Sequence, residues 1–182
     1  MYNDVMLGAG KATGMFYTAP KGTALPTTPG ESLAAAWQLV GDVDEDGATL
    51  HLPNGDVIRN WALTAKRKIN TENGTVSVKI MDTTKKTLEV LFGSNNVSYT
   101  AASTTHGNVT KVELSPDVSA EPAAYLFLMK DGDRLSMIGT SDGLITEIAD
   151  VSFKAGDPVL WDTTIDATWT FATDDGQVAS AS

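Results

Sequence analysis

The sequence predicts a mainly β fold, a β-sandwich or partial barrel with one flanking α-helix. Stretches of alternating apolar and polar residues recur along the chain, the longest at Val159–Phe171, and a period of two is typical of half-buried strands. Asp-Gly and Asn-Gly pairs, which favour tight turns, separate many of these stretches. The clearest helical stripe lies in Asp82–Phe92 and ends at Gly93.

The 182 residues are expected to form one domain with a short segment at each end. Residues 1–30 are rich in Gly, Pro, Thr and Ala, and we expect an N-terminal arm there, either frayed or ordered on a neighbouring subunit. Only Met15–Tyr17 in this arm has the composition of a strand. Residues 31–177 are expected to form the β-sandwich, and residues 178–182 a mobile C-terminal tail.

Ser32–Leu50 is predicted to join the arm to the sandwich. A short helix capped by Ser32 is expected first, because apolar residues fall at i, i+3, i+4 and i+7: Leu33, Ala36, Trp37 and Val40. Gly41 then ends the helix with a positive φ, and Asp46-Gly47 turns the chain into a strand. We expect Trp37, Val40 and Gly41 to anchor this N-terminal module on the β body.

The next elements are predicted from their turns and their alternation. Leu50–Trp61 is expected to be a hairpin around Pro53–Asp56, and Ala65–Asn70 a basic loop or strand edge. Glu72–Met81 places Val76, Val78 and Ile80 on one face, as a half-buried strand does. Asp82 then caps a helix that ends at Phe92, before Gly93, and whose apolar stripe holds Leu88, Leu91 and Phe92.

The second half is predicted to be almost wholly β. Short strands are expected at Val97–Ala101 and Val109–Leu114, and Ala124–Lys130 and Arg134–Thr140 are expected to form a hairpin around Asp131-Gly132. Leu144–Phe153 follows the turn signal Asp142-Gly143 and is predicted as a strand, although its spacing also permits a helix.

Val159–Phe171 is predicted to be one long strand that Pro158 introduces. One face carries apolar side chains and Thr163, in the order Val159, Trp161, Thr163, Ile165, Ala167, Trp169 and Phe171. From Asp162 onward the other face carries only acidic and small polar side chains, among them Asp162, Thr164, Asp166 and Thr168. A period of two puts the two sets on opposite sides of the sheet.

Composition excludes several classes of protein. The formal net charge is −10, so the chain lacks the basic footprint that binding to nucleic-acid phosphates requires. There is no Cys, which excludes disulfides and thiolate metal sites and fits folding in a reducing cytosol. No run approaches the ~20 apolar residues of a membrane helix, and Met1 is followed by no secretory signal.

Catalytic, cofactor and metal motifs are absent, and we assign no residue to any of these roles. His51 and His106 lie near neither a nucleophile motif nor a second His at ligand spacing. The glycines at positions 8–14 match neither a P-loop nor a dinucleotide fingerprint. Asp42–Gly47 resembles half an EF-hand loop, but Pro53 stands where the bidentate Glu is needed, so an acidic turn is the favoured interpretation.

Four stretches together resemble a known family. They are Ala12–Pro26 (ATGMFYTAPKGTALP), Ala36–Gly47 (AWQLVGDVDEDG), Leu88–Gly93 (LEVLFG) and Val151–Pro158 (VSFKAGDP). The first is preceded by a run with Asn, Met and Gly at Asn3–Gly8. This profile resembles the major tail protein, or tail tube protein, of long-tailed bacteriophages, especially those of actinobacteria.

The resemblance implies a structural subunit and no enzyme. Six subunits would form a ring whose inner sheets join into a continuous β-barrel, and stacked rings would form a virion tube through which DNA passes without specific binding. It also implies synthesis in the host cytoplasm and contacts with the tape measure, tail tip and terminator proteins, and it implies neither a cofactor nor a membrane. With this architecture in mind, we expect Asp162, Thr164, Asp166 and Thr168 to face the lumen.

Two other classes of function stay open from the sequence. A monomeric β-sandwich that binds carbohydrate would use exposed Trp side chains, for which Trp61, Trp161 and Trp169 are the candidates. A hydrolase would use a pair of carboxylates that only the fold brings together.

Overall fold

The structure is a computed structural model that describes residues 16–53, 56–59, 66–69, 73–115, 118–131 and 133–174. Several of the expectations above fall outside these residues. They concern the first fifteen residues of the arm, the Asn54-Gly55 turn, Trp61 and the C-terminal tail Val178–Ser182.

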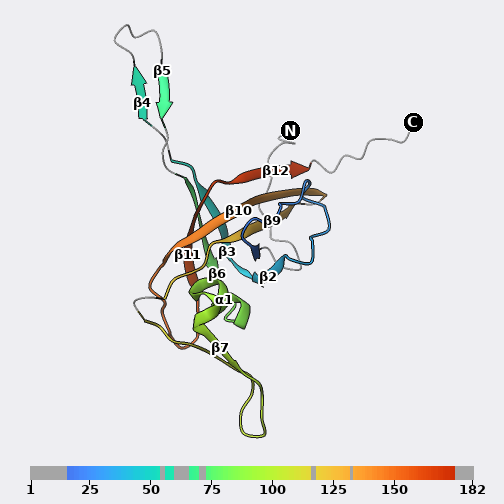
Figure 1. Ribbon diagram of the computed structural model, residues 1–182, viewed down its shortest axis with the longest axis vertical. Helices are drawn as coiled ribbons and strands as arrows, with labels where there is room; N and C mark the ends of the chain where they lie inside the picture. Colours follow the sequence, from blue (N-terminus) through green and yellow to red (C-terminus); the bar gives the residue numbers. More distant parts are fainter. Residues whose placement is uncertain are drawn as a thin grey trace, which may run out of the picture.

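One antiparallel sheet of eight strands forms the body of the molecule (Figure 1). The strand order is β2 (Gln38–Gly41), β1 (Phe16–Pro20), β9 (Ala123–Asp131), β10 (Arg134–Ile148), β11 (Trp161–Ala167), β6 (Gly74–Ile80) and β3 (Val43–His51). A last strand, β12 (Thr170–Asp174), pairs with β10 next to β11. The mainly β prediction is therefore confirmed, although the sheet is not closed into a barrel.

Two smaller ladders stand apart from this sheet. β4 (Asp56–Arg59) pairs with β5 (Lys66–Ile69), and β7 (Val97–Thr100) pairs with β8 (Val109–Val112). In Figure 1 the two ladders extend from opposite ends of the body. The predicted hairpin over Leu50–Trp61 is wrong, because β3 pairs with β6 and β4 finds its partner in β5.

The sheet curls until its two ends meet at one residue. β2 and β3 occupy the opposite ends of the strand order, yet only Asp42 separates them in the chain. The Asp42 carbonyl accepts a hydrogen bond of 2.9 Å from the N–H of Met81, at the end of β6. The Asp42 N–H donates to Asp82 Oδ2 at 2.9 Å. These two bonds fasten the start of β3 to the end of β6 at the corner where the chain leaves β2.

The curled sheet packs on itself around the main hydrophobic cluster. Phe16 of β1 and Phe127 of β9 stack with their ring centroids 4.5 Å apart, an arrangement that contributes about 0.5–1.5 kcal/mol beyond the area it buries. Val76 of β6 and Ile165 of β11 enter the same cluster from the other half of the sheet. The two halves therefore face each other as the layers of a sandwich do.

The one α-helix among the described residues, α1 (Lys85–Phe92), covers part of this cluster with Leu88, Val90 and Leu91. Its end at Gly93, where φ is 81°, confirms the predicted stop. The predicted cap at Asp82 is wrong by two residues. Thr84 caps the helix by accepting from the Thr87 N–H at 3.1 Å, because the helix begins only at Lys85, and the Asp82 carboxylate accepts from the Asp42 N–H instead. A short 3₁₀ turn, η1 (Ser94–Asn96), follows.

A second hydrophobic cluster lies on the opposite face of β1, β9 and β10. Alternate residues of β9 supply it with Ala124, Leu126 and Leu128, while their neighbours Tyr125 and Phe127 enter the main cluster. The segment between β1 and β2 covers this face, with Leu25, Leu33 and Trp37 packed against it. β9 is therefore apolar on both sides, as a central strand requires.

The helix predicted between Ser32 and Val40 does not form. The Trp37 N–H bonds to the Ala34 carbonyl at 2.9 Å in a turn, and β2 begins at the next residue. A helix of two turns makes few hydrogen bonds for the cost of its nucleation, and pairing with β1 replaces them. Gly41 is correspondingly not at positive φ.

Two predicted Asp-Gly turns are β-bulges inside strands. Gly47, at φ 69°, lies in β3, where the residues from Val43 to Ala48 stand opposite only Ile80 to Val78. Gly143 lies in β10, where one extra residue follows Thr140. Gly47 supplies a positive φ, and Gly143 leaves room for the Tyr125 ring, since a Cβ there would lie 2.9 Å from its Cδ2. The dipeptide alone therefore does not distinguish a bulge from a turn.

The remaining strands agree with the alternation except near their ends. β6, β9, the start of β10, β7 and β8 confirm the predictions to within a few residues, and strand structure after the Gly143 bulge ends at Ile148 rather than Phe153. The predicted strand Val159–Phe171 divides into β11 and β12 at Thr168-Trp169. This break shifts the alternation, so Phe171 is 56% exposed while Ala172 packs on the second cluster.

Candidate assembly surfaces

The polar face of β11 is the first candidate surface. Trp161, Thr163, Ile165 and Ala167 are buried, and the side chains between them point to the opposite side of the sheet. Of the four residues predicted to share that side, Asp162, Thr164 and Asp166 are half-buried, and Thr168 is exposed just beyond the strand.

The neighbouring strand β6 extends this polar face. Asp162 stands opposite Lys79, Thr164 opposite Ser77, and Asp166 opposite Thr75. The hydroxyl oxygens of Ser77 and Thr164 lie 3.4 Å apart, so the two strands present one continuous row of polar groups.

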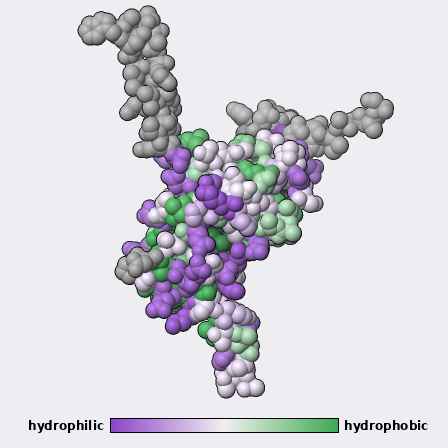
Figure 2. All heavy atoms as spheres, viewed as in Figure 1, coloured by the Kyte–Doolittle hydropathy of each residue, from purple (hydrophilic) through white to green (hydrophobic). Residues whose placement is uncertain are grey.

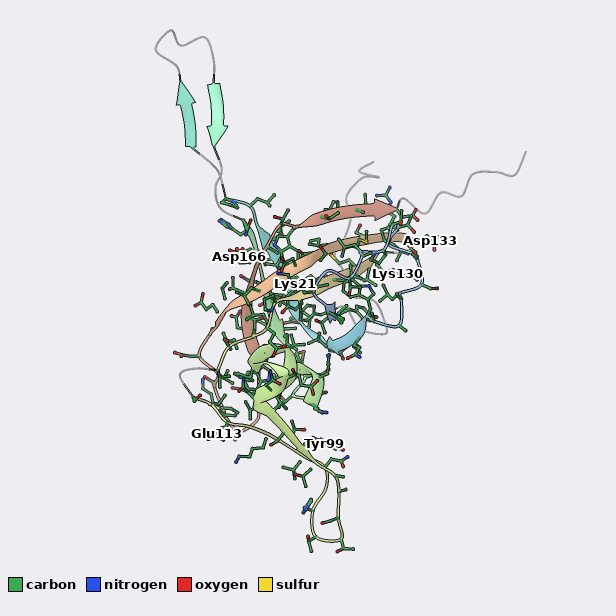
Figure 3. The ribbon with its side chains drawn as sticks, viewed as in Figure 1. Lys21, Tyr99, Glu113, Lys130, Asp133 and Asp166 are labelled. Carbon is green, nitrogen blue, oxygen red and sulfur yellow. The ribbon has the colours of Figure 1, made fainter. Side chains whose placement is uncertain are left out.

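One end of this polar face is tied to the start of β6. Asn73 Nδ2 donates to Asp166 Oδ1 at 2.8 Å, and the Trp169 indole N–H donates to the Gly74 carbonyl at 3.0 Å. Figure 3 shows Asp166 at this end of the sheet, far from Lys130 and Asp133 at the turn between β9 and β10. The bonds hold the Asp166 carboxylate on the outer side of the sheet.

Carboxylates outnumber the cation at the other end of the same face. Lys79 Nζ donates to Asp46 Oδ2 at 2.5 Å. That hydrogen bond, the charge of Asp46 and the weaker fields of Asp44 and Asp162 raise the pKa of Lys79 above its usual value. Because three carboxylates act on one ammonium group, this part of the surface keeps a negative charge.

The three residues predicted to anchor the N-terminal module do not form one patch. Trp37 packs in the second cluster with 8% of its surface exposed, whereas Val40 is buried in the main cluster. Gly41 lies at the corner where the sheet ends meet, and a Cβ there would come within 2.7 Å of Asp82 Cβ. The three side chains therefore contact different parts of the structure, and their anchoring role stays a prediction.

Unpaired strand edges form a second candidate surface. In the described part of the chain, β2, β3 and β12 each pair with a single neighbour. The far edge of each strand leaves backbone N–H and C=O groups without a ladder partner. Such edges are templates for pairing with another chain unless they are covered.

Hydrophilic side chains dominate the lower part of the body in Figure 2, over and around α1, with hydrophobic residues scattered among them. Several large apolar side chains are nevertheless exposed, the most exposed being Phe153 at 77% and Leu114 at 71%. Exposed apolar residues are common on single subunits, and those that become covered in an assembly add to its stability.

The described structure shows neither a metal-ligand cluster nor an exposed Trp ring of the kind that a carbohydrate-binding surface uses. Among the described residues, no three His, Cys, Asp or Glu side chains come together as metal ligands. His51 and His106 are both exposed. Trp161 is buried and Trp169 half-buried, so neither presents a free ring for stacking on a sugar. No helix in the described ranges is long and apolar enough to cross a membrane.

Several contacts that shape these surfaces were not predicted. Asp82 at the corner, Lys21 paired with Asp142 at 2.9 Å, and the Gly22 N–H bonded to the Ser141 carbonyl at 2.7 Å all join residues far apart in the sequence. No local pattern distinguishes these residues. The corner contact depends on the curl of the sheet, and the other two depend on β9 bringing the end of β1 close to Ser141 and Asp142 of β10.

A comparison with known protein families found one described as phage tail tube protein, whose model matches residues 3–169. No curated protein matches the chain. The match spans most of the chain, including every strand of the eight-stranded sheet except β12. It confirms the resemblance noted from the sequence. Proteins of this family are structural parts of the virion and not enzymes.

Proposed function

The chain belongs to the phage tail tube protein family, and from that premise we propose that it polymerises as stacked hexameric rings around a lumen that conducts DNA. Its family membership already makes it a tail component that assembles with itself and with other tail proteins. The ring, the lumen and the passage of DNA are the proposal. The observation that carries it is the polar, acidic face of β11 and β6 on the outer side of a sheet with unpaired edges.

The polar face is assigned to the lumen, with Asp162, Thr164, Asp166 and Thr168 pointing toward the DNA. A sheet that buries one face needs water or another subunit on the other face. The hydroxyls and carboxylates offer no cation to a phosphate, and Lys79 is already paired with Asp46. DNA therefore meets a hydrated, repelling wall along which it slides without sticking.

The net charge acts in the same direction. Six copies of a chain with a formal charge of −10 carry −60 per ring. Charges on the outside of a tube are screened beyond about 8–10 Å in physiological salt, whereas charges that line a narrow lumen lie within that distance of the DNA. The acidic composition thus matters most where the tube is narrowest.

Ring closure also accounts for the unpaired edges. Pairing β2, β3 or β12 with a neighbouring subunit satisfies backbone groups that each free subunit leaves to water. A closed ring with rotational symmetry has no exposed edge left at these positions. The part of the expected arm that precedes β1 and residues 178–182 are proposed to bridge subunits and rings. Residues 16–30 do not act as a free arm, because Phe16–Pro20 pairs with β2 and β9 inside the sheet and Leu25 packs on the second cluster.

The proposal extends to the partners and the location of the subunit. By the same resemblance, the tube would contact the tape measure, tail tip and terminator proteins. Synthesis in the host cytoplasm would precede incorporation into the virion, from which DNA is ejected through the tube.

Electron microscopy of the purified full-length protein at high concentration tests the assembly. Hollow tubes of stacked rings with six-fold symmetry are expected, if necessary after addition of the tail tip complex. Rings of another symmetry, or a chain that stays monomeric in the presence of all its tail partners, would refute the hexameric arrangement.

A further inference from the structure

Three strand edges of the main sheet lack a ladder partner in the described part of the chain, and they differ in how well they resist pairing. Proteins protect an exposed edge by keeping the strand short, by bulges and by charged side chains. β2 has four residues, of which the last two are buried. The first half of β3 is bulged up to Gly47 and carries Asp44, Glu45 and Asp46. β2 and this half of β3 are therefore protected edges.

β12 lacks these protections over most of its length. Its five residues, Thr170–Asp174, pair with β10 in a register without a shift. Three of them are aromatic or β-branched, as strands prefer, and the one charge stands at the end. Four are exposed, among them Phe171 at 56%. In Figure 1 β12 lies at the margin of the body with β10 on its inner side. The outer edge of Thr170–Thr173 is therefore a template to which another strand can be added.

The second half of β3 offers a strand of matching length. Beyond the bulge, Ala48–His51 pairs with β6 in an unbroken register and contains no acidic residue, Lys, Arg or Pro. Ala48 and Leu50 pack on the main cluster, whereas Thr49 and His51 between and beyond them are exposed. The far edge of these four residues is therefore as regular and as uncharged as the edge of β12.

A ring of identical subunits needs two different edges on each of them, because a head-to-tail contact joins one edge of a subunit to the other edge of the next. β12 and β3 meet this need, since β3 ends the strand order and β12 lies beside β10. Their faces also agree. Phe171 stands opposite Ile138 of the main cluster, so Thr170 points away from that cluster, as Thr49 does. Pairing of the two strands would continue the polar side of the sheet from one subunit into the next.

We propose that the Thr170–Thr173 edge of β12 pairs with Ala48–His51 of β3 in a second copy of the chain. The inference rests on the self-assembly proposed above and narrows ring closure to one pair of edges. Backbone N–H and C=O groups of the two strands supply the hydrogen bonds. Ala48 and Leu50 of the copy lie on the same side of the joined sheet as Phe171, so this exposed ring gains an apolar neighbour across the contact.

Cross-linking between single cysteines tests the contact, since the chain contains no cysteine of its own. Full-length Thr170→Cys and Thr49→Cys variants are mixed, polymerised and treated with a short bis-maleimide, which tolerates a slip of two residues, about 7 Å. Cross-linked dimers are expected from the mixture and not from either variant alone. Thr170→Cys mixed with Gln38→Cys is the matched control, because Gln38 is exposed on β2, and this mixture should give no dimers.

A charge placed on the edge gives an independent measurement. Phe171→Lys should raise the critical concentration for tube formation at least about tenfold, because a Lys on an edge strand opposes pairing. Leu39→Lys is the matched control on β2 and should polymerise like the wild type. Phe171 and Leu39 are 56% and 43% exposed in the free subunit, so both variants should keep the wild-type unfolding midpoint. If Phe171→Lys does not fold, the cross-linking result decides by itself.

The outcomes separate this contact from the proposed function. Tubes that form without a cross-link between positions 170 and 49 would refute the edge pairing and leave the tube intact. Cross-links of Thr170→Cys to Gln38→Cys, or between two Thr170→Cys chains, would replace β3 by another partner and refute it equally. If the wild type forms no tube at all, the proposed function fails and this inference fails with it.

Discussion

Asp82 accepts a hydrogen bond from the backbone N–H of Asp42, with 2.9 Å between Oδ2 and the nitrogen. The two residues are forty positions apart, yet this contact lies where the first and last strands of the sheet are joined by one residue. Gly41 next to Asp42 has no room for a side chain, because a Cβ would lie 2.7 Å from Asp82 Cβ. A glycine and a carboxylate therefore lie in close contact at the corner where the two ends of the curled sheet meet.

Gly41→Ala should destabilise the subunit. Its added methyl group forces the backbone of β2 away from Asp82, and overpacking of this kind costs about 1–3 kcal/mol. Urea unfolding followed by tryptophan fluorescence measures the loss. Gly107→Ala is the control, since nothing lies within 4 Å of a Cβ at position 107, and its midpoint should match the wild type. Equal midpoints for both variants would show that the corner relaxes freely.

Thr84→Ala should weaken α1 at its first turn. The Thr84 hydroxyl caps the helix by accepting from the Thr87 N–H, and loss of such a cap costs about 0.5–2 kcal/mol. Thr84→Ser keeps the oxygen and should retain most of the stability, while Asp82→Asn should act through the corner rather than the cap. Denaturant unfolding measures the stability of each variant. If Thr84→Ser proves as unstable as Thr84→Ala, the methyl group of Thr84 matters and not its cap.

Alkaline pH should destabilise the subunit in part through Tyr125. Burial raises the pKa of its phenol in the folded state above the value near 10 of the unfolded chain. The stabilising difference is therefore complete below pH 10 and is lost as the pH rises above that value, since only the unfolded chain then releases its proton easily. Unfolding free energies measured between pH 8 and 11 should fall less steeply for Tyr125→Phe than for the wild type. Parallel curves would show that the phenol ionises in place.

Changing Asp162 and Asp166 together to Lys tests the lumen assignment. The change reverses the local charge by four units per subunit, and in a narrow lumen the new cations should bind phosphate and slow the ejection of DNA. Assembled particles carrying the variant should therefore eject more slowly in a fluorescence assay of DNA release, with the difference reduced at high salt.

Glu113 and Asp133 supply the matched control for this charge reversal. They are exposed just after β8 and at the turn between β9 and β10, away from the polar face of β11, and their change to Lys alters the net charge equally. That control should eject at the wild-type rate. Normal ejection by the Asp162 and Asp166 variant would place the polar face on the outside of the tube.

Residue periodicity predicted those strands and helices whose apolar pattern is set by a single face packed on the core. Val76, Val78 and Ile80 alternate with polar residues because β6 has one face on the core, and Leu88 and Leu91 share a helical stripe because α1 has one face on the same core. Gly93 stops the helix through its own positive φ. These are properties of a few consecutive residues, so the chain carries them in its local sequence.

Elsewhere, long-range strand pairing decided whether an Asp-Gly pair forms a turn or a bulge and where an alternating run is interrupted. Asp46-Gly47 and Asp142-Gly143 serve bulges because β3 and β10 have partners that continue past them. Phe171 is exposed because the strand breaks at Thr168-Trp169 and the alternation restarts in β12, which pairs with β10. No dipeptide signal specifies the strand that will lie beside it.

The acidic charge, the mainly β fold and the polar row of β11 follow from the sequence alone, because charge is additive and alternation is local. The meeting of Gly41, Asp42 and Asp82, and the burial of the Tyr125 hydroxyl, were decided only by the tertiary structure. Both depend on how far an eight-stranded sheet curls. That curl is a sum of small twists over many strand pairs, to which each residue contributes too little to be recognised in its own neighbourhood.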